Sequence, residues 1–277
     1  MTLELEQYLN QEIPGRAEFI AELQNLYPPE DVHGLNHALE VEKRAIEVLE
    51  IACQEAEESE ERPSVNLVVL TYAALGHDVG YIVEERMSLD KFEHQAEGGK
   101  IVKGIIGRYP FLSQREKAGI VLLTMTHDDT DYTYPLKSRG GKPLLTRKQI
   151  KQRERAVERL GFLTESKILK EADSSLATGE IGLKRTIEFS TRKGLPFFAD
   201  GKKPLEAEMW EVSITSNLRL SARRAFEDAF TQEGKKEAIS GWLVQEKEIF
   251  RRCRLEGIGY SLDPCLAEVI IHWHENS

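Results

Sequence analysis

Cysteine is scarce in this chain of 277 residues, and the three that occur, Cys53, Cys253 and Cys265, form no CxxC pair. A secreted disulfide framework and a thiolate zinc module both require closely spaced cysteines, so neither is expected. Long apolar runs are also missing. The most apolar stretch, 65–75, contains polar residues and reaches about half of the ~20 residues that a membrane-spanning helix needs. We therefore expect a buried core helix at 65–75 and no membrane partner.

Basic residues are fewer than acidic ones, 37 against 47, which gives a net charge of −10. Binding of duplex nucleic acid requires a coherent positive face that displaces counterions, so no such partner is expected. A small anionic substrate stays possible, since positive charge can be local. The first ten residues lack the basic segment of a signal peptide. Together with the few cysteines, this predicts a cytoplasmic protein.

The sequence has no internal repeat and no low-complexity tract, which excludes solenoid and collagen-like folds. Its apolar residues follow helical spacing. After His37 they recur at steps of three or four, at Val41, Ala45, Val48 and Ala52. The same spacing begins again at Leu67, Ile120 and Leu218. Strand-like alternation is absent from these segments, so we predict an all-α fold of roughly ten helices.

Helix-breaking residues divide the chain into three parts. Residues 1–30 are expected to form an N-terminal helical arm, and 31–180 contain nothing that resembles a linker, so they should form one core. Residues 181–277 are expected to form a C-terminal helical extension that packs on this core. Glycine and proline in the stretch 193–204 mark a further candidate boundary.

Five of the seven histidines lie in the first half of the chain, at the ends of predicted helices. His33 and His37 are four residues apart and so share one helical face. The adjacent pair His77-Asp78 closes a strongly apolar helix just before a glycine. Because burying an unpaired carboxylate costs several kcal/mol, a metal ion or a hydrogen-bond network is expected beside Asp78.

Later helices present further polar residues on apolar faces. His94 opens one helix, His127 ends the helix 118–127, and Asp173 lies on a face that points toward the core. Helical proteins build dinuclear metal sites from inward-facing residues of these types. The acidic run 128–131 is similar to a calcium loop only superficially, since it lacks the required glycine and glutamate, and it is not assigned.

In order and type, these residues resemble the H…HD…H…H…D series of the HD-domain superfamily of metal-dependent phosphohydrolases. The matching positions are His37, His77, Asp78, His94, His127 and Asp173. The resemblance implies an HD-domain helical bundle with additional C-terminal helices. Residues 33–38 are similar to the HNxxHA element of the cyclic-nucleotide phosphodiesterase branch, and 77–81 to the HDxG element. Many bacterial members have lysine where this chain has Tyr81, so Tyr81 is expected to pack rather than to act as an acid.

Carried over residue by residue, the resemblance implies a site for two divalent metal ions. The first ion is held by His37, His77, Asp78 and Asp173, and the second by His94 and His127, with Asp78 bridging. In the phosphodiesterase branch the corresponding histidine protonates the leaving oxygen, so the resemblance implies that His33 is the general acid; the alternative is a solvated histidine at a helix start. Asp78 is counted among the catalytic residues as well. Imidazoles and carboxylates without thiolates suit iron, manganese, nickel, zinc or cobalt. Two such ions outweigh the two carboxylates in charge, so the loaded site would attract a phosphate.

The predicted function is metal-dependent hydrolysis of phosphate esters or anhydrides of a small molecule, with a nucleotide as the preferred substrate. One alternative is a di-iron oxygenase of the inositol-oxygenase type, which has the same ligand types in the same order. Another is a regulatory module that binds a nucleotide or metal without turnover. Lys137, Arg139 and Lys142 in the predicted loop 129–145 could clamp phosphates, although a solvated loop is favoured.

Overall fold

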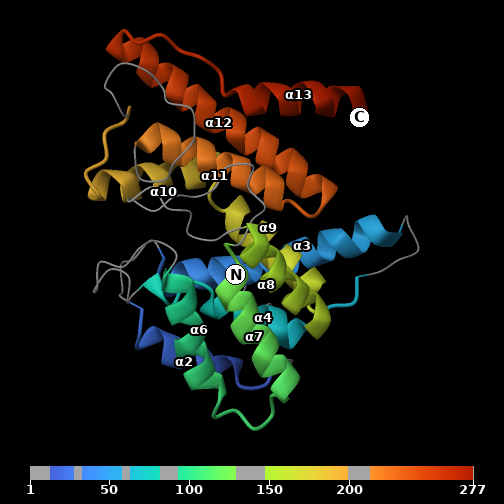
Figure 1. The fold of residues 1–277 in the computed structure, drawn as a ribbon. Coiled ribbons are helices and arrows are strands. Elements are labelled where there is room, and N and C mark those ends of the chain that lie inside the picture. Colours follow the sequence, from blue (N-terminus) through green and yellow to red (C-terminus); the bar gives the residue numbers. More distant parts are fainter. Residues whose placement is uncertain are drawn as a thin grey trace. The chain divides into compact units, whose positions relative to one another are not determined.

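The computed structural model describes residues 13–27, 33–57, 63–81, 93–128, 147–198 and 213–276. Over these residues it contains eleven helices and no strand, which confirms the all-α prediction (Figure 1). None of the described helices is long and apolar enough to cross a membrane. The loop 129–145, the first twelve residues of the predicted N-terminal arm and the stretch beyond 198 up to 212 lie outside the described residues.

The described chain divides into two compact units within α9 (Leu163–Ser175). The N-terminal unit takes in the described residues up to Asp173, and the C-terminal unit takes in those from Ser174 onward. The sequence placed the end of the core near 180. A core of that extent, with a C-terminal extension packed on it, stays a prediction.

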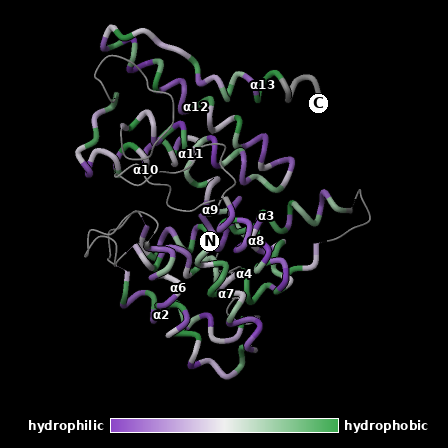
Figure 2. Tube along the Cα trace, viewed as in Figure 1, coloured by the Kyte–Doolittle hydropathy of each residue, from purple (hydrophilic) through white to green (hydrophobic). Residues whose placement is uncertain are grey.

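The N-terminal unit surrounds one apolar helix, α4 (Leu67–Gly76), whose last eight residues are all buried. A helix that is apolar on every side must be enclosed by others, and α4 contacts α2, α3 and α7. By contrast, α8 is largely hydrophilic (Figure 2). The other helices of this unit are α2 (Arg16–Gln24), α3 (Leu35–Glu57), α6 (Glu93–Ile106), α7 (Gln114–Thr126), α8 (Arg147–Leu160) and most of α9.

Asn66 links three helices of this unit at one point. Its side chain caps α4 by accepting a hydrogen bond from the Val69 backbone N–H at 3.0 Å. Its amide group donates to Glu116 on α7 at 3.2 Å, and its backbone N–H donates to Glu165 on α9 at 2.6 Å. The beginning of α4 is thereby tied to the first turns of α7 and α9.

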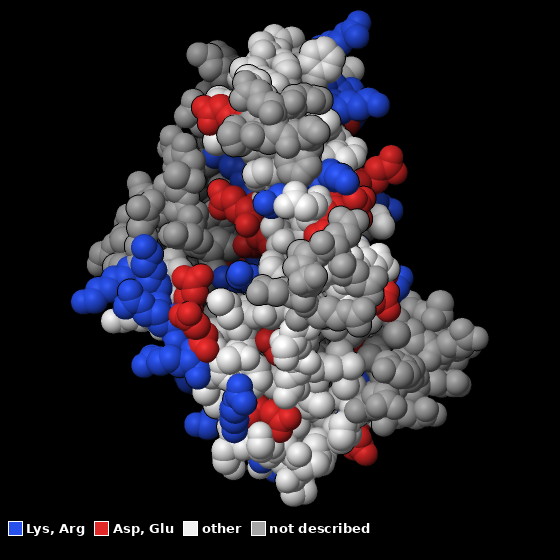
Figure 3. Space-filling view, turned by 90° about the vertical axis from the view of Figure 1, so that its right-hand side faces the viewer, with Lys and Arg blue, Asp and Glu red and all other residues white. Residues whose placement is uncertain are grey.

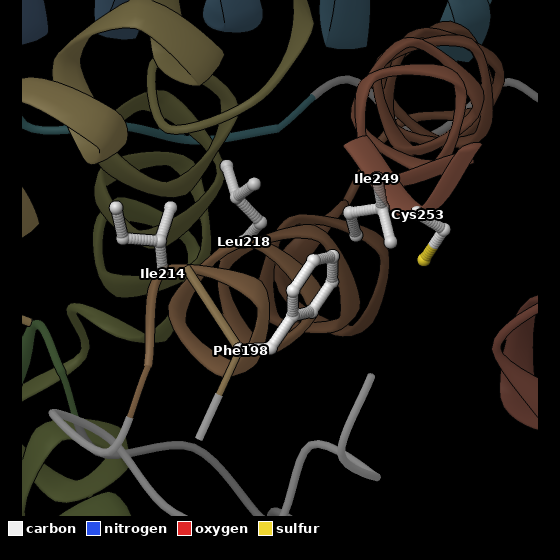
Figure 4. Close-up of a cluster of buried hydrophobic side chains, with 5 residues drawn as sticks. All are labelled: Phe198, Ile214, Leu218, Ile249 and Cys253. Carbon is white, nitrogen blue, oxygen red and sulfur yellow. The ribbon is translucent and has the colours of Figure 1, made fainter. Parts of the chain in front are cut away.

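The C-terminal unit consists of α10 (Gly179–Arg192), α11 (Ile214–Asp228), α12 (Gln232–Glu256) and α13 (Pro264–Asn276). Its largest apolar cluster contains Phe198, Ile214, Leu218, Ile249 and Cys253 (Figure 4). Two buried ion pairs accompany this core, Arg219 with Glu246 and Arg223 with Asp263, each at 2.6 Å. Figure 3 shows basic and acidic side chains interspersed over the described surface of one face.

A buried ion pair joins α2 to α3 and should dominate the stability of that contact. The Arg16 guanidinium donates two hydrogen bonds to the Glu42 carboxylate, at 2.6 and 2.5 Å, and both side chains are 0% exposed. Glu42→Ala leaves the guanidinium buried without this carboxylate, so the free energy of unfolding should fall by about 3–5 kcal/mol. The double variant Arg16→Met, Glu42→Leu should recover most of the loss. Urea unfolding followed by circular dichroism measures both, and a single-variant loss below about 1 kcal/mol would contradict the interpretation.

Two glycines provide a matched test of how closely α6 approaches the turn after α4. A Cβ atom on Gly80 would lie 1.8 Å from the carbonyl oxygen of His94, whereas a Cβ on Gly104 would meet nothing within 4 Å. Gly80→Ala should therefore lower the free energy of unfolding by about 1–3 kcal/mol. Gly104→Ala, on an exposed position of α6, should raise it by about 0.5–1 kcal/mol. Equal effects of the two substitutions in thermal unfolding would rule out a close contact at Gly80.

Candidate metal centre

The N-terminal unit brings eight histidine and aspartate side chains together from the ends of its helices. They are His33 and His37 at the start of α3, His77 and Asp78 after α4, His94 at the start of α6, His127 and Asp128 after α7, and Asp173 near the end of α9. Seven of these side chains are at most 12% exposed, and His33 is 23% exposed. All six residues that the sequence predicts as metal ligands are in this cluster, together with the predicted acid, His33.

Asp78 lies at the centre of the cluster and faces different histidines with its two oxygens. Its Oδ2 atom is 2.9 Å from His33 Nδ1, 3.2 Å from His77 Nε2 and 3.5 Å from His37 Nε2. Its Oδ1 atom is 3.4 Å from His127 Nε2. A carboxylate in this position can contribute one oxygen to each of two neighbouring ions.

Asp173 completes the first group of possible ligands. Its Oδ1 atom is 3.3 Å from His37 Nε2 and 3.6 Å from His77 Nε2. One donor atom from each of His37, His77 and Asp173 lies within 4.8 Å of the others. A second group with the same spacing contains Asp78, His94 and His127. The first group has three of the four ligands that the resemblance implies for the first ion, and the second has the three implied for the second ion. Two overlapping groups have the same spacing, one with His33, His37 and Asp78 and one with His127, Asp128 and Asp173.

The cluster also contains Asp128, which the sequence pattern does not single out. Its Oδ2 atom lies 3.3 Å from His94 Nε2 and 3.4 Å from His127 Nε2, and the residue is 7% exposed. One feature of the sequence could have identified Asp128: it directly follows the histidine that ends an apolar helix, as Asp78 follows His77. That signal is obscured because Asp128 also opens an acidic run typical of a loop.

Backbone carbonyls determine which ring nitrogen points into the cluster. Nδ1 of His77 is 2.8 Å from the carbonyl oxygen of Ala74, and Nδ1 of His127 is 2.8 Å from that of Thr124. Because a carbonyl can only accept, Nδ1 of each ring carries the hydrogen, and in the neutral imidazole Nε2 presents a lone pair. The buried Nε2 of His77 makes no hydrogen bond within the described part of the chain. This is the tautomer that binds a metal through Nε2.

The charges of the cluster favour a cation between its carboxylates and imidazoles. Burial opposes ionisation of His77, but Asp78 and Asp173 outweigh it and raise the pKa of His77 well above its usual range. Burial likewise opposes ionisation of Asp78, yet His77, His127 and His33 lower the pKa of Asp78 well below its usual range. A proton on His77 or a metal ion can supply the charge between these groups. The described residues, with nitrogen and oxygen donors and no thiolate, therefore fit the divalent ions expected from the sequence.

Tyr81 is sandwiched between two histidines of the cluster. Its ring stacks on His33 with centroids 4.1 Å apart and an interplanar angle of 12°, and on His94 at 3.9 Å and 19°. Gly80 permits this arrangement, because its missing side chain lets the turn after α4 approach the His94 backbone. Tyr81 thus packs against the site itself and restrains the ring planes of both histidines.

The basic side chains of the predicted loop lie outside the described residues, so a phosphate clamp there stays untested. The likeness of residues 33–38 to the phosphodiesterase branch stays a prediction.

Comparisons with known proteins support the fold. No family model matches the sequence, and no curated protein matches it. The solved structure of an HD-superfamily hydrolase from Bacillus thuringiensis is similar, with a TM-score of 0.52 and 16% identity over 90% of this chain and 99% of that one. The structure of a protein from Lactobacillus plantarum gives 0.53 and 16% over 86% of this chain and 95% of that one. The chain therefore shares the fold of these two structures, and its histidines and aspartates gather in one buried cluster.

Proposed function

We propose that this protein is a metal-dependent hydrolase of phosphate esters or anhydrides of a small molecule, with a nucleotide as the preferred substrate. The observation that carries the proposal is the position of Asp78, which lies in one group with His94 and His127 and is also within 3.5 Å of His37 and His77 of the neighbouring group. Two adjacent sites for divalent ions are the arrangement that enzymes use for in-line displacement at phosphorus. The similar Bacillus thuringiensis protein is itself called a hydrolase, which supports the reaction class but not the substrate.

In this proposal, His37, His77, Asp78 and Asp173 hold the first ion, and His94 and His127 share the second with Asp78. Bound there, divalent ions would supply Lewis acidity toward a phosphoryl group and activate water for attack. The protein residues hold the ligand atoms in place. Hydrogen bonds from the His77 and His127 rings to backbone carbonyls hold their Nε2 atoms toward the ions.

His33 has the position that a proton donor needs. It is the most exposed member of the cluster, at 23%, so a substrate can reach it. Its Nδ1 atom lies 2.9 Å from Asp78 Oδ2 and its ring is stacked on Tyr81, so two contacts orient the imidazole. Imidazole is the side chain that enzymes use most often for general acid catalysis. We propose that His33 protonates the leaving oxygen of the substrate.

The preference for a phosphorylated substrate follows from charge. The protein as a whole is acidic, with a net charge of −10. Two divalent ions in the cluster would make the site locally positive, so the site would select an anion against the repulsion of the surrounding surface. Nucleotides are the preferred class because they present phosphate esters and anhydrides in one molecule.

The first prediction concerns metal removal. Protein stripped with EDTA should lose phosphate release from a panel of nucleotides and phosphoesters, and Mn²⁺ should restore it. Asp78→Ala should empty both sites, whereas His94→Ala should leave about one ion per chain, because Asp78 faces histidines of both groups and His94 belongs to the second group alone. Elemental analysis measures the ions, and a colorimetric phosphate assay measures the activity.

The same experiment distinguishes the alternatives left open by the sequence. If the whole panel is inert with metals loaded, while the iron form consumes O₂ with inositol-like polyols, the protein is an oxygenase and the hydrolase proposal is wrong. If nucleotides bind to the loaded protein without any turnover, it is a regulatory binding module.

The second prediction tests His33 as the acid. His33→Ala should retain the metal content and lower kcat by roughly 10²–10⁴-fold, the usual contribution of general acid catalysis. With a nitrophenyl ester the loss should be much smaller, because that leaving group needs no proton. His37→Ala, one helical turn further on, is the control: it should lower metal content and impair both substrates alike. Equal losses on both substrates with His33→Ala would remove His33 from the acid role.

A further inference from the structure

Helices α4 and α7 end in the same local structure. Each is followed by a histidine that still has helical backbone angles, with φ of −57° at His77 and −58° at His127. In both, the ring Nδ1 binds the carbonyl oxygen three residues earlier at 2.8 Å. An aspartate comes next in each case, Asp78 or Asp128, and both are buried. Asp128 therefore has at the end of α7 the position that Asp78 has at the end of α4.

The carboxylate of Asp128 faces the two imidazoles of the second ligand group. Its Oδ2 atom lies 3.3 Å from His94 Nε2 and 3.4 Å from His127 Nε2. From the other side, Asp78 Oδ1 lies 3.4 Å from the same nitrogen of His127. Carboxylate oxygens of Asp78 and Asp128 thus both lie 3.4 Å from His127 Nε2, and Asp128 also has the spacing of a possible ligand together with His127 and Asp173.

The charges that meet here favour a cation among them. Because Nδ1 of His127 donates to the Thr124 carbonyl, the neutral ring presents a lone pair at Nε2. A lone pair that faces two carboxylate oxygens is repelled by both unless a cation lies among them. A proton on Nε2 supplies one positive charge against two carboxylates, whereas a divalent ion supplies two and binds oxygen and nitrogen ligands together.

We infer that Asp128 is a ligand of the second metal ion, which is then held by two imidazoles and two carboxylates. The inference rests on the proposed metal centre and is independent of the reaction and the substrate. Neither the sequence pattern nor the resemblance assigns this residue a role. A third carboxylate has two chemical consequences. It makes the second site more favourable for Mn²⁺, because carboxylates suit Mn²⁺ while imidazoles suit zinc and nickel. It also lowers the net positive charge of the loaded site by one.

The test measures metal binding rather than activity. Full-length protein is stripped with EDTA and titrated with Mn²⁺ by calorimetry, and the ions retained are counted by elemental analysis. The native chain should bind about two Mn²⁺ ions. Asp128→Ala should keep one ion and weaken the second by more than about 10²-fold, beyond the 10–100-fold that loss of an orienting partner typically causes.

Three further variants separate ligation from packing. Asp128→Asn preserves size and hydrogen-bond acceptance but removes the charge, so it should weaken the second ion nearly as much as Asp128→Ala. Asp128→His replaces one donor with another and should restore a second ion while shifting the preference from Mn²⁺ toward Zn²⁺. Glu165→Gln is the matched control: this carboxylate is 2% exposed in the same unit and lies outside the cluster, so both ions should remain.

The inference is overturned if Asp128→Asn binds two Mn²⁺ ions with native affinity, or if the native chain binds only one. Because Asp128→Asn is nearly isosteric, it should fold even if Asp128→Ala does not, and a circular dichroism melt in EDTA verifies this. Failure of the proposed function gives a different result. If the chain needs Asp128 for its second ion but hydrolyses no phosphoester, this inference stands and the hydrolase proposal is wrong.

Discussion

A carboxylate buried among imidazoles is the constraint on which the N-terminal unit depends. The Asp78 side chain is 5% exposed and has ring nitrogens of four histidines within 3.5 Å. An isolated charge at this depth would cost several kcal/mol, so the fold must supply compensating groups from several elements at once. Those groups come from α3, α4 and α7, and their convergence requires that the ends of these helices meet.

A small number of contacts bring these helix ends together. Asn66 ties the first turns of α4, α7 and α9 together, so the helices that carry His77, His127 and Asp173 share an anchor at the opposite end from the cluster. Gly80 lets α6 approach closely enough to bring in His94. The possible ligands thus lie on rigid helix ends, which is the arrangement that a metal site with fixed geometry requires.

Much of the cluster could be predicted because its residues occupy the apolar faces of amphipathic helices. A histidine such as His37 or an aspartate such as Asp173 on such a face must point inward whatever the tertiary packing is. Asp128 is different, since it follows the last turn of α7 at the start of an acidic run. Its burial depends on α6 and α7 packing side by side, which no local pattern encodes. The stacking of Tyr81 between His33 and His94 depends likewise on tertiary packing, that of the turn after α4 against the starts of α3 and α6.

By itself, the sequence determined that the protein is all-α, because its apolar residues repeat at steps of three and four, and that the ordered histidines and aspartates belong to one interior site. The tertiary structure alone decided which of these side chains lie next to one another. It directs the two oxygens of Asp78 toward different imidazoles, places Asp128 beside His94 and His127 and leaves His33 as the most exposed member. The physical reason is that periodicity determines which way a side chain points from its own helix, whereas a distance between side chains on different helices depends on how those helices pack.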